Sequence, residues 1–238
     1  MKLEHAVVFV TGANRGLGLE FARQALARGA RKVYAGARDP ATVTLPGVVP
    51  VRVDITDPAQ VAQAAADCAD VTLVVNNAGI ALMGGSLLDA AGNDGLRRML
   101  DTNVFGLLNV SQAFAPVLAA NGGGALLNVL SVASWISTPA LAAYAATKSA
   151  AWSVTNGLRI ALQEQRTQVL GLHVGFVDTD LTRGIDLPKL APAEVVDKGY
   201  AALEAGASEV LVDELSRNVK RGLSAEPGIY LDAVRRPE

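Results

Sequence analysis

A tyrosine and a lysine four residues apart give this chain a means of moving a proton. Tyr144 and Lys148 lie in a segment of helical period, where residues i and i+4 share one face. A free phenol has a pKa near 10, so acid and base work around neutral pH requires its pKa to fall by about 3, or roughly 4 kcal/mol. An ammonium at about 4 Å in an effective dielectric of about 20 supplies a comparable free energy. The spacing therefore predicts a tyrosine tuned by the lysine.

A serine stands where a substrate oxygen could meet that phenol. Ser131 follows the apolar run at residues 125–130, which we expect to be a buried strand. Ligands of open α/β sheets bind at the carboxyl ends of the strands, so the serine hydroxyl would lie at such a site. The hydroxyl would orient a carbonyl oxygen beside the phenol of Tyr144. These residue types together indicate carbonyl reduction.

The first apolar run leads into a glycine-rich turn and then into an amphipathic segment. Residues 11–18 read TGANRGLG, with glycines at Gly12, Gly16 and Gly18. A turn of this kind lets the backbone approach a pyrophosphate, whose charge meets unpaired amides at the positive end of the helix. The spacing G-x3-G-x-G differs from the common G-x-G-x-x-G fingerprint. We predict that a dinucleotide cofactor binds at this turn.

Two arginines bear on the choice of nicotinamide cofactor. An acidic side chain at the end of the second strand would bind the ribose hydroxyl of NAD, whereas a basic one accommodates the 2′-phosphate of NADP. The chain has Ala37 and then Arg38 at this point, and Arg15 lies within the glycine turn. Guanidinium groups suit bidentate phosphate contacts, so we predict NADP (NADPH) over NAD. Pairing of Asp39 with Arg38 would weaken this prediction.

Positioning these residues requires a layered scaffold, and the hydrophobic pattern indicates one. Short runs rich in Val, Leu and Ile lack polar alternation and are followed by longer segments of helical period. The expected strands cover residues 6–10, 32–36, 49–53, 71–75, 125–130, 169–174 and 209–212. The expected helices cover residues 16–28, 58–68, 92–120, 142–165 and 192–205. Right-handed crossovers then predict an α/β fold, a doubly wound, mostly parallel seven-stranded Rossmann sheet in a single domain over residues 1–238.

Composition agrees with that fold and argues against several classes of function. Of 238 residues, 50% are hydrophobic and 18% are charged, with 21 basic and 23 acidic side chains. This balance leaves no strong field for nucleic acid or an anionic membrane, and no stretch approaches the roughly 18 apolar residues of a membrane span. One cysteine, Cys68, cannot form an intrachain disulfide, and two histidines without a carboxylate cluster predict no metal site. We expect a cytoplasmic protein with neither nucleic-acid nor membrane partners.

The motifs together resemble those of the short-chain dehydrogenase/reductase family, in its ordinary-length branch, over essentially the whole chain. The residues that carry the resemblance are TGANRGLG at 11–18, Asp54, NNAG at 76–79, Asn103, Ser131, YAATK at 144–148 and GFVDT at 175–179. The chain departs from the family pattern at Val174, where a proline is usual before the glycine, and at Leu130, where a second serine is common. Both departures bear on the shape of the nicotinamide and substrate pocket.

The resemblance implies a role for each of these positions. Tyr144 would protonate the carbonyl oxygen while NADPH delivers hydride, Lys148 would hold the nicotinamide ribose, Ser131 would orient the substrate and Asn103 would anchor a relay water. As a poor helix former inside residues 92–120, Asn103 is also consistent with a kink. With the glycine turn and the arginines included, the expected cofactor contacts are Gly12, Asn14, Arg15, Gly16, Leu17, Gly18, Arg38, Asp54, Ile55, Asn76, Ala78, Gly79, Tyr144, Lys148, Gly175, Val177 and Thr179. The resemblance also implies a homodimer or homotetramer.

The walls expected around the reacting carbon are mostly apolar. Residues 180–192 lack periodicity and follow a strand end, so we expect them to form a substrate lid. An apolar pocket favours a hydrophobic ketone, aldehyde or secondary alcohol, which predicts an NADPH-dependent carbonyl reductase or alcohol dehydrogenase. The alternative is a non-catalytic binding protein that senses NADP. The side chains expected at the substrate are Ser131, Met83, Trp135, Phe176 and Leu181.

Overall fold

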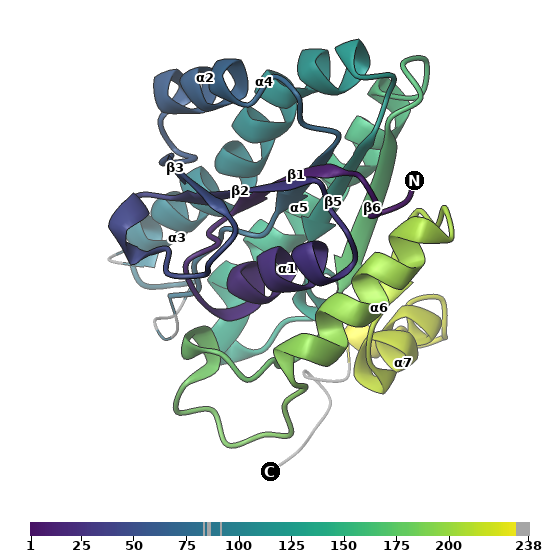
Figure 1. Cartoon of the computed structure of the whole chain (residues 1–238). Coiled ribbons are helices and arrows are strands. Elements are labelled where there is room, and N and C mark those ends of the chain that lie inside the picture. Colours follow the sequence, from purple (N-terminus) through teal and green to yellow (C-terminus); the bar gives the residue numbers. More distant parts are fainter. Residues whose placement is uncertain (83, 85–86, 91, 232–238) are drawn as a thin grey trace.

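A parallel sheet runs through the centre of the molecule in the computed structural model, which describes residues 1–82, 84, 87–90 and 92–231 (Figure 1). Its seven strands have the order β3-β2-β1-β4-β5-β6-β7, and each neighbouring pair is parallel. The strand order reverses between β1 and β4, which is where doubly wound sheets bind ligands. The prediction of a doubly wound parallel sheet is confirmed. The strands are β1 (Val7–Thr11), β2 (Lys32–Ala37), β3 (Val49–Arg52), β4 (Leu73–Asn76), β5 (Ala125–Val129), β6 (Gln168–His173) and β7 (Glu209–Leu211).

Helices cover both faces of this sheet (Figure 1). On one face α1 and α6 pack against each other and the strands, while α2, α4 and α5 cover the other. In β1, Val8 and Val10 pack in the core between the sheet and the α1 face, whereas Val7 and Phe9 pack in the core on the opposite face. Both faces of the strand are therefore buried. This explains its uninterrupted apolar run. The α-helices are α1 (Gly16–Ala27), α2 (Pro58–Asp67), α3 (Gly92–Leu100), α4 (Leu107–Ala120), α5 (Ala142–Ala161), α6 (Pro192–Glu204) and α7 (Glu214–Gly222).

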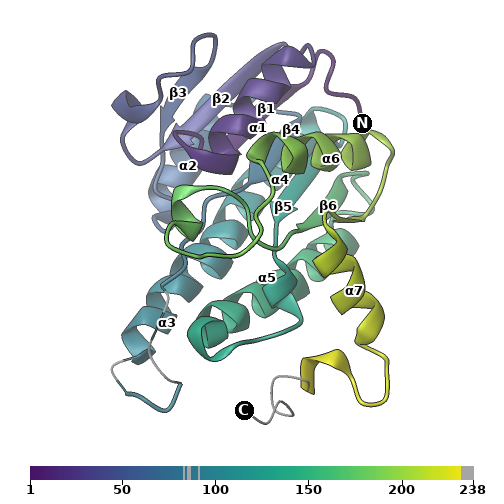
Figure 2. The same ribbon diagram turned by 90° about the horizontal axis from the view of Figure 1, so that it is seen from below.

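The long helix expected over residues 92–120 contains a change of helical type. A π-helical stretch, Asp101–Gly106, connects α3 to α4, and α3 packs beside α5 (Figure 2). A Cβ at Gly106 would lie 2.6 Å from Cδ1 of Ile55, so glycine allows the close approach of this stretch to the loop after β3. The irregularity expected at Asn103 is therefore present as a π-helical insertion, a feature frequent at functional sites.

The same helical segment also has the length and composition of a membrane span, contrary to our expectation. It is 29 residues long, and its most apolar window has a mean hydropathy of 1.3 with 44% of the window buried in the fold. Val110, Phe114 and Leu118 of α4 are fully buried in the core beneath the sheet. Packing on the sheet accounts for this apolar composition, as it does in the core helices of globular domains.

Three local features differ from the sequence prediction. The connection from β2 to β3, for which no helix was expected, contains a short 3-10 helix, Pro40–Thr42. Helix α5 ends at Ala161, four residues before the expected end, where Leu162 leaves helical geometry. Helix α7 was not predicted, because few of its residues are apolar; Asp213 caps it by accepting from the backbone N of Ser216 at 2.6 Å.

Candidate active site

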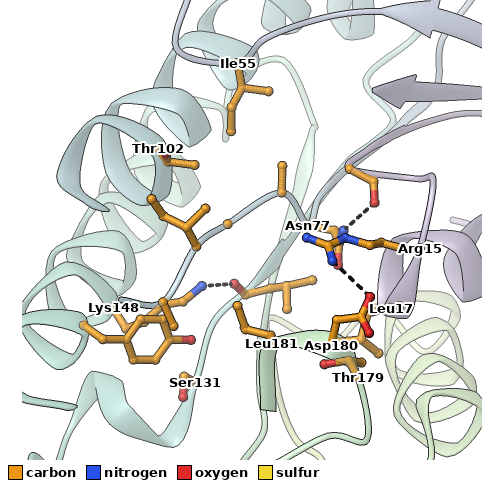
Figure 3. Close-up of a pocket in the computed structure, with 18 of the residues that line it drawn as sticks. Arg15, Leu17, Ile55, Asn77, Thr102, Ser131, Lys148, Thr179, Asp180 and Leu181 are labelled. Atoms are coloured by element: carbon orange, nitrogen blue, oxygen red, sulfur yellow. Dashed lines mark hydrogen bonds and ion pairs between the residues drawn. The ribbon is translucent and has the colours of Figure 1, made fainter. Parts of the chain in front are cut away.

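A cleft of about 1340 Å³ lies along the carboxyl ends of the strands (Figure 3). All strands of a parallel sheet end at this edge, so motifs far apart in the sequence meet there. The loops after β1, β2, β3, β4, β5 and β6 all contribute to its walls. The predicted site residues that line it are Gly12, Asn14, Arg15, Gly16, Leu17, Arg38, Asp54, Ile55, Ala78, Gly79, Ser131, Tyr144, Lys148, Gly175, Phe176, Val177, Thr179 and Leu181.

The glycine turn has the geometry that a pyrophosphate requires. Gly12 and Gly16 have φ angles of +64° and +54°, which favour glycine, and a Cβ at Gly12 would lie 3.2 Å from Cα of Ala78. Arg15 at the N-cap of α1 makes no capping side-chain bond, so the side chain leaves the first amides of this helix uncovered. Gly18 does not line the cleft: its Cβ would lie 2.1 Å from the Gly12 oxygen, so it serves the packing of α1 on the turn. The turn therefore fits a bound dinucleotide.

The loop after β4 is fastened to the glycine turn by Asn77, which the prediction passed over in favour of Asn76. The side-chain amide of Asn77 donates to the carbonyls of Thr11 at 2.9 Å and Gly12 at 3.3 Å. The Thr11 hydroxyl accepts from the backbone N of Asn77 and of Ala78, each at 3.0 Å. Asn76 is buried off the cleft, where its amide donates to Ser111 and Asn128. The structure thus places Asn77 at the cofactor groove in place of Asn76.

Ser131, Tyr144 and Lys148 converge at the floor of the cleft from two elements. Ser131 follows β5 and accepts a bond from the backbone N of Ala133 at 3.1 Å, and its hydroxyl lies close enough to the phenol of Tyr144 to affect the phenol's pKa. Tyr144 and Lys148 lie in the first two turns of α5. The Lys148 ammonium donates to the Val129 carbonyl at 3.0 Å and lies 5.7 Å from the centre of the Tyr144 ring (Figure 3).

Burial controls the proton affinities of the two titratable residues. Burial raises the pKa of Tyr144 to about 12, against the opposing effect of the nearby Ser131 hydroxyl, and lowers the pKa of Lys148 to about 8. The expectation that Lys148 brings the tyrosine pKa towards neutrality is not met. The ammonium is directed at the Val129 carbonyl, and desolvation of the phenolate is the largest influence on the phenol's pKa. At neutral pH the phenol keeps its proton, which suits it to act as an acid.

Asn103 is buried beside the cleft and does not line it. Its amide oxygen accepts from the backbone N of Ile80 at 2.8 Å, and its NH2 donates to the Ile80 carbonyl at 2.9 Å and to the Thr147 hydroxyl at 3.0 Å. The side chain therefore ties the loop after β4 to α5 one residue before Lys148. Its expected water-anchoring role stays a prediction.

The two predicted phosphate-binding arginines lie at the rim of the cleft. Arg38 is exposed, and Asp39 does not form an ion pair with it in the described part of the chain; Asp39 accepts instead from the backbone N of Ala41 at 3.1 Å. Arg15 donates to the Asp180 carboxylate at 3.0 Å (Figure 3). This bond lowers the pKa of Asp180, with further help from Arg183.

The expected lid is anchored at both ends. It begins in a short 3-10 helix, Asp180–Thr182, and Leu190 near its end forms a β-bridge with Val177. Lys189 donates to the carbonyl of Thr182 at 2.9 Å, which closes the loop on itself. Opening and closing of this segment stay a prediction.

The substrate wall differs from the prediction at one residue. Phe176 and Leu181 line the cleft, joined by Ile80 and Leu82. Trp135 does not: the short 3-10 helix after Ser131 turns it into the protein, where it is 8% exposed. Met83 lies outside the described residues. Side-chain direction after a strand end, which decided this case, is not visible in a hydrophobic pattern.

Comparisons with known proteins agree with this geometry. The family profile described as short chain dehydrogenase matches residues 6–189. Galactitol 2-dehydrogenase (L-tagatose-forming) of Cereibacter sphaeroides is 35% identical over 76% of this chain and 75% of its own length. Dehydrogenase/reductase SDR family member 7B of Bos taurus is 31% identical over 76% of this chain, which spans 60% of that longer protein.

A solved structure extends the likeness to the whole chain. The short chain dehydrogenase from Burkholderia cenocepacia J2315 in complex with NADP is 40% identical, with a TM-score of 0.94 and complete coverage of both chains. These likenesses give no support to a non-catalytic sensor. The chain belongs to the short-chain dehydrogenase/reductase family and is an oxidoreductase that acts on CH–OH and C=O groups.

Proposed function

We propose that the protein is an NADPH-dependent carbonyl reductase, and in reverse a secondary-alcohol dehydrogenase, acting on a hydrophobic ketone or aldehyde. The observation that carries this proposal is the meeting of Ser131, Tyr144 and Lys148 in one cleft, with the Lys148 ammonium 5.7 Å from the centre of the Tyr144 ring. Two hydroxyl groups that line the same part of a cleft can bind one carbonyl oxygen. With a pKa of about 12 the phenol carries its proton at neutral pH, so it has a proton to give once negative charge develops on the substrate oxygen.

The residues of the cleft divide the reaction between them. The glycine turn and the open end of α1 would hold the pyrophosphate, and the bound nicotinamide supplies hydride to the carbonyl carbon. Ser131 and Tyr144 hold the carbonyl oxygen, and Tyr144 gives it a proton as negative charge develops there. The Lys148 ammonium stabilises the phenolate that remains. Carbonyl, hydride and proton together give the alcohol.

The charge pattern at the rim supports NADPH as the cofactor. Ala37 ends β2, so that strand offers no carboxylate to the ribose hydroxyls, and Arg38 follows it. The Asp54 carboxylate is committed to Thr56, accepting from its backbone N at 3.0 Å and its hydroxyl at 2.7 Å. Arg15 is 69% exposed and reaches the same groove, so a 2′-phosphate would meet two guanidinium groups.

The substrate end of the cleft supports a hydrophobic carbonyl compound. The apolar side chains there come from the loops after β4 and β6 and from the short 3-10 helix, Pro139–Leu141, that precedes α5. A wall of this composition binds through apolar contact and leaves orientation to the two hydroxyl groups. The residues concerned are Ile80, Leu82, Leu141, Phe176 and Leu181.

A carbonyl panel with matched variants tests the proposal. We expect loss of NADPH absorbance with aryl or alkyl ketones or aldehydes, and collapse of turnover in Tyr144→Phe with unchanged NADPH affinity. NADPH binding is measured separately by its fluorescence. A protein that binds NADPH and consumes none across a varied panel would refute this substrate class. Full turnover by Tyr144→Phe would refute the assigned proton donor.

A further inference from the structure

A fully buried histidine lies directly behind Ser131 and has no part in the chemistry described above. His173 is the last residue of β6, next to β5, and its side chain is 0% exposed. Its Nδ1 atom lies 3.2 Å from the backbone oxygen of Ser131. A carbonyl oxygen only accepts hydrogen bonds, so this contact requires the hydrogen to be on Nδ1.

The other edge of the ring faces a charged pair. Nε2 of His173 lies 3.4 Å from a carboxylate oxygen of Glu209, the first residue of β7, and Glu209 forms an ion pair with Lys220 of α7 at 3.1 Å. His173 and then Lys220 hold the pKa of Glu209 down at about 2, so the carboxylate is charged across the working pH range. A chain of contacts thus runs from Lys220 through Glu209 and His173 to Ser131.

The ring of His173 is also held on its face. The Trp135 ring stacks on it with centroids 4.0 Å apart and planes 18° apart. The ammonium of Lys220 lies 4.6 Å from the Trp135 ring centre, so it contacts both partners of the histidine. Stacking on Trp135 holds the plane of the imidazole, and the contact with the serine backbone directs its Nδ1 edge.

We propose that His173 is a positioning residue for Ser131. The serine carbonyl also accepts from the backbone N of Ser134 at 3.0 Å, and the adjacent peptides are held by the bonds Leu130 N to Leu172 O and Val132 N to Val174 O. The His173 bond adds a side-chain contact to this carbonyl. This contact fixes the backbone of Ser131, and the side-chain hydroxyl of that residue faces the reacting oxygen beside Tyr144. This inference rests on the proposed function for its kinetic consequence alone.

A measurement without substrate tests the geometry. The sequence holds two histidines, and His5 has an exposed side chain, so His5→Gln assigns the ring resonances of His173 directly. Nitrogen-15 correlation spectra of the imidazole should show hydrogen on Nδ1 in the free enzyme. A neutral ring with hydrogen on Nε2 alone would overturn the proposal, whatever the enzyme reduces.

A double-mutant cycle tests the action on Ser131. We expect His173→Leu to lower kcat about tenfold, the loss typical of one buried hydrogen bond, with the KM for NADPH unchanged. His173→Asn keeps a donor near the position of Nδ1 and should recover most of the rate. In a Ser131→Ala background the leucine substitution should cost no further rate.

Other results contradict the positioning role. Equal losses from His173→Leu in both backgrounds would show a general structural effect, as would an asparagine variant as slow as the leucine one. If the leucine variant does not fold, His173→Phe serves in its place: it keeps a flat ring against Trp135, removes the Nδ1 donor, and should lower kcat with Ser131 present and not in Ser131→Ala. Absence of turnover in the unsubstituted enzyme would refute the proposed function. The imidazole spectra would then decide whether His173 contacts the backbone of Ser131 as proposed.

Discussion

The buried ammonium of Lys148 makes stability depend on pH in a direction that can be worked out in advance. Burial lowers its pKa from 10.5 to about 8. Between these values the unfolded chain holds a proton that the folded chain has released. Linkage then requires the free energy of unfolding to rise with pH across this window, by roughly 3 kcal/mol in total. Below about pH 8 the full cost of the buried charge is present.

The perturbation is Lys148→Met, which keeps an unbranched side chain and removes the titrating group. Denaturant unfolding at about pH 7 and about pH 10 gives the free energy of unfolding of both proteins. We expect the unsubstituted protein to gain most of the roughly 3 kcal/mol relative to the variant between these two conditions. The bond to the Val129 carbonyl, lost in the variant, contributes little to the difference between the two conditions.

A surface lysine provides the matched control. Bonds to Asp70 and Tyr34 raise the pKa of Lys32, so its stabilising contribution is present below pH 10.5 and is lost only above it. Lys32→Met should therefore leave the stability gain between about pH 7 and about pH 10 nearly unchanged. If the free energy of unfolding depends on pH in the same way in the unsubstituted protein and in Lys148→Met, burial does not lower the pKa of Lys148. The role assigned to Lys148 beside Tyr144 would then be wrong as well.

Three further expectations concern the cofactor and the assembly. Replacing both Arg15 and Arg38 with alanine should lower kcat/KM for NADPH ten- to a hundredfold for each lost guanidinium contact, or roughly 1.5–3 kcal/mol each. The value of kcat/KM for NADH should change little. Equal rates with NADPH and NADH in the unsubstituted enzyme would contradict the assignment of the two arginines to a 2′-phosphate. Asp180→Asn removes the ion-pair partner of Arg15, so it should lower the Kd for NADPH by a small factor in fluorescence titrations at low salt. High salt should abolish this difference in Kd, because it screens the charges. Ile160 of α5 is 75% exposed, and we expect it to lie in an interface between copies of the chain. Light scattering after size-exclusion chromatography should find a dimer or tetramer, and Ile160→Asp should dissociate it. A monomeric unsubstituted protein would contradict this expectation.

Features fixed by local pattern could be predicted from the sequence. The uninterrupted apolar run of β1 reflects a strand buried on both faces, and the turn after it needs glycine at two left-handed positions. Tyr144 and Lys148 share a helix face because their spacing matches one helical turn. Each signal is contained in a few neighbouring residues, so the parallel sheet and the position of the cleft follow from them.

Features decided by side-chain direction at strand ends could not be predicted. Asn76 and Asn77 are chemically identical neighbours, yet one turns under the sheet to Ser111 and the other turns to the glycine turn. Trp135 faces His173 because a short 3-10 helix reverses the chain after Ser131. The pair of Arg15 and Asp180 joins two loops 165 residues apart in the sequence. Such contacts exist only once the sheet has brought the loops together.

The same burial acts in opposite directions on the two proton-carrying groups, and this determines how the site responds to pH. Desolvation disfavours the phenolate of Tyr144 and the ammonium of Lys148 alike, raising one pKa to about 12 and lowering the other to about 8. Near neutral pH the phenol holds its proton beside a cation that can stabilise its anion, which is the protonation state that reduction requires. Alcohol oxidation needs the phenolate at the start, so its rate should rise with pH, whereas kcat/KM for reduction should fall above about pH 8 as the lysine loses its charge. Parallel pH profiles in the two directions would show that other groups control the proton.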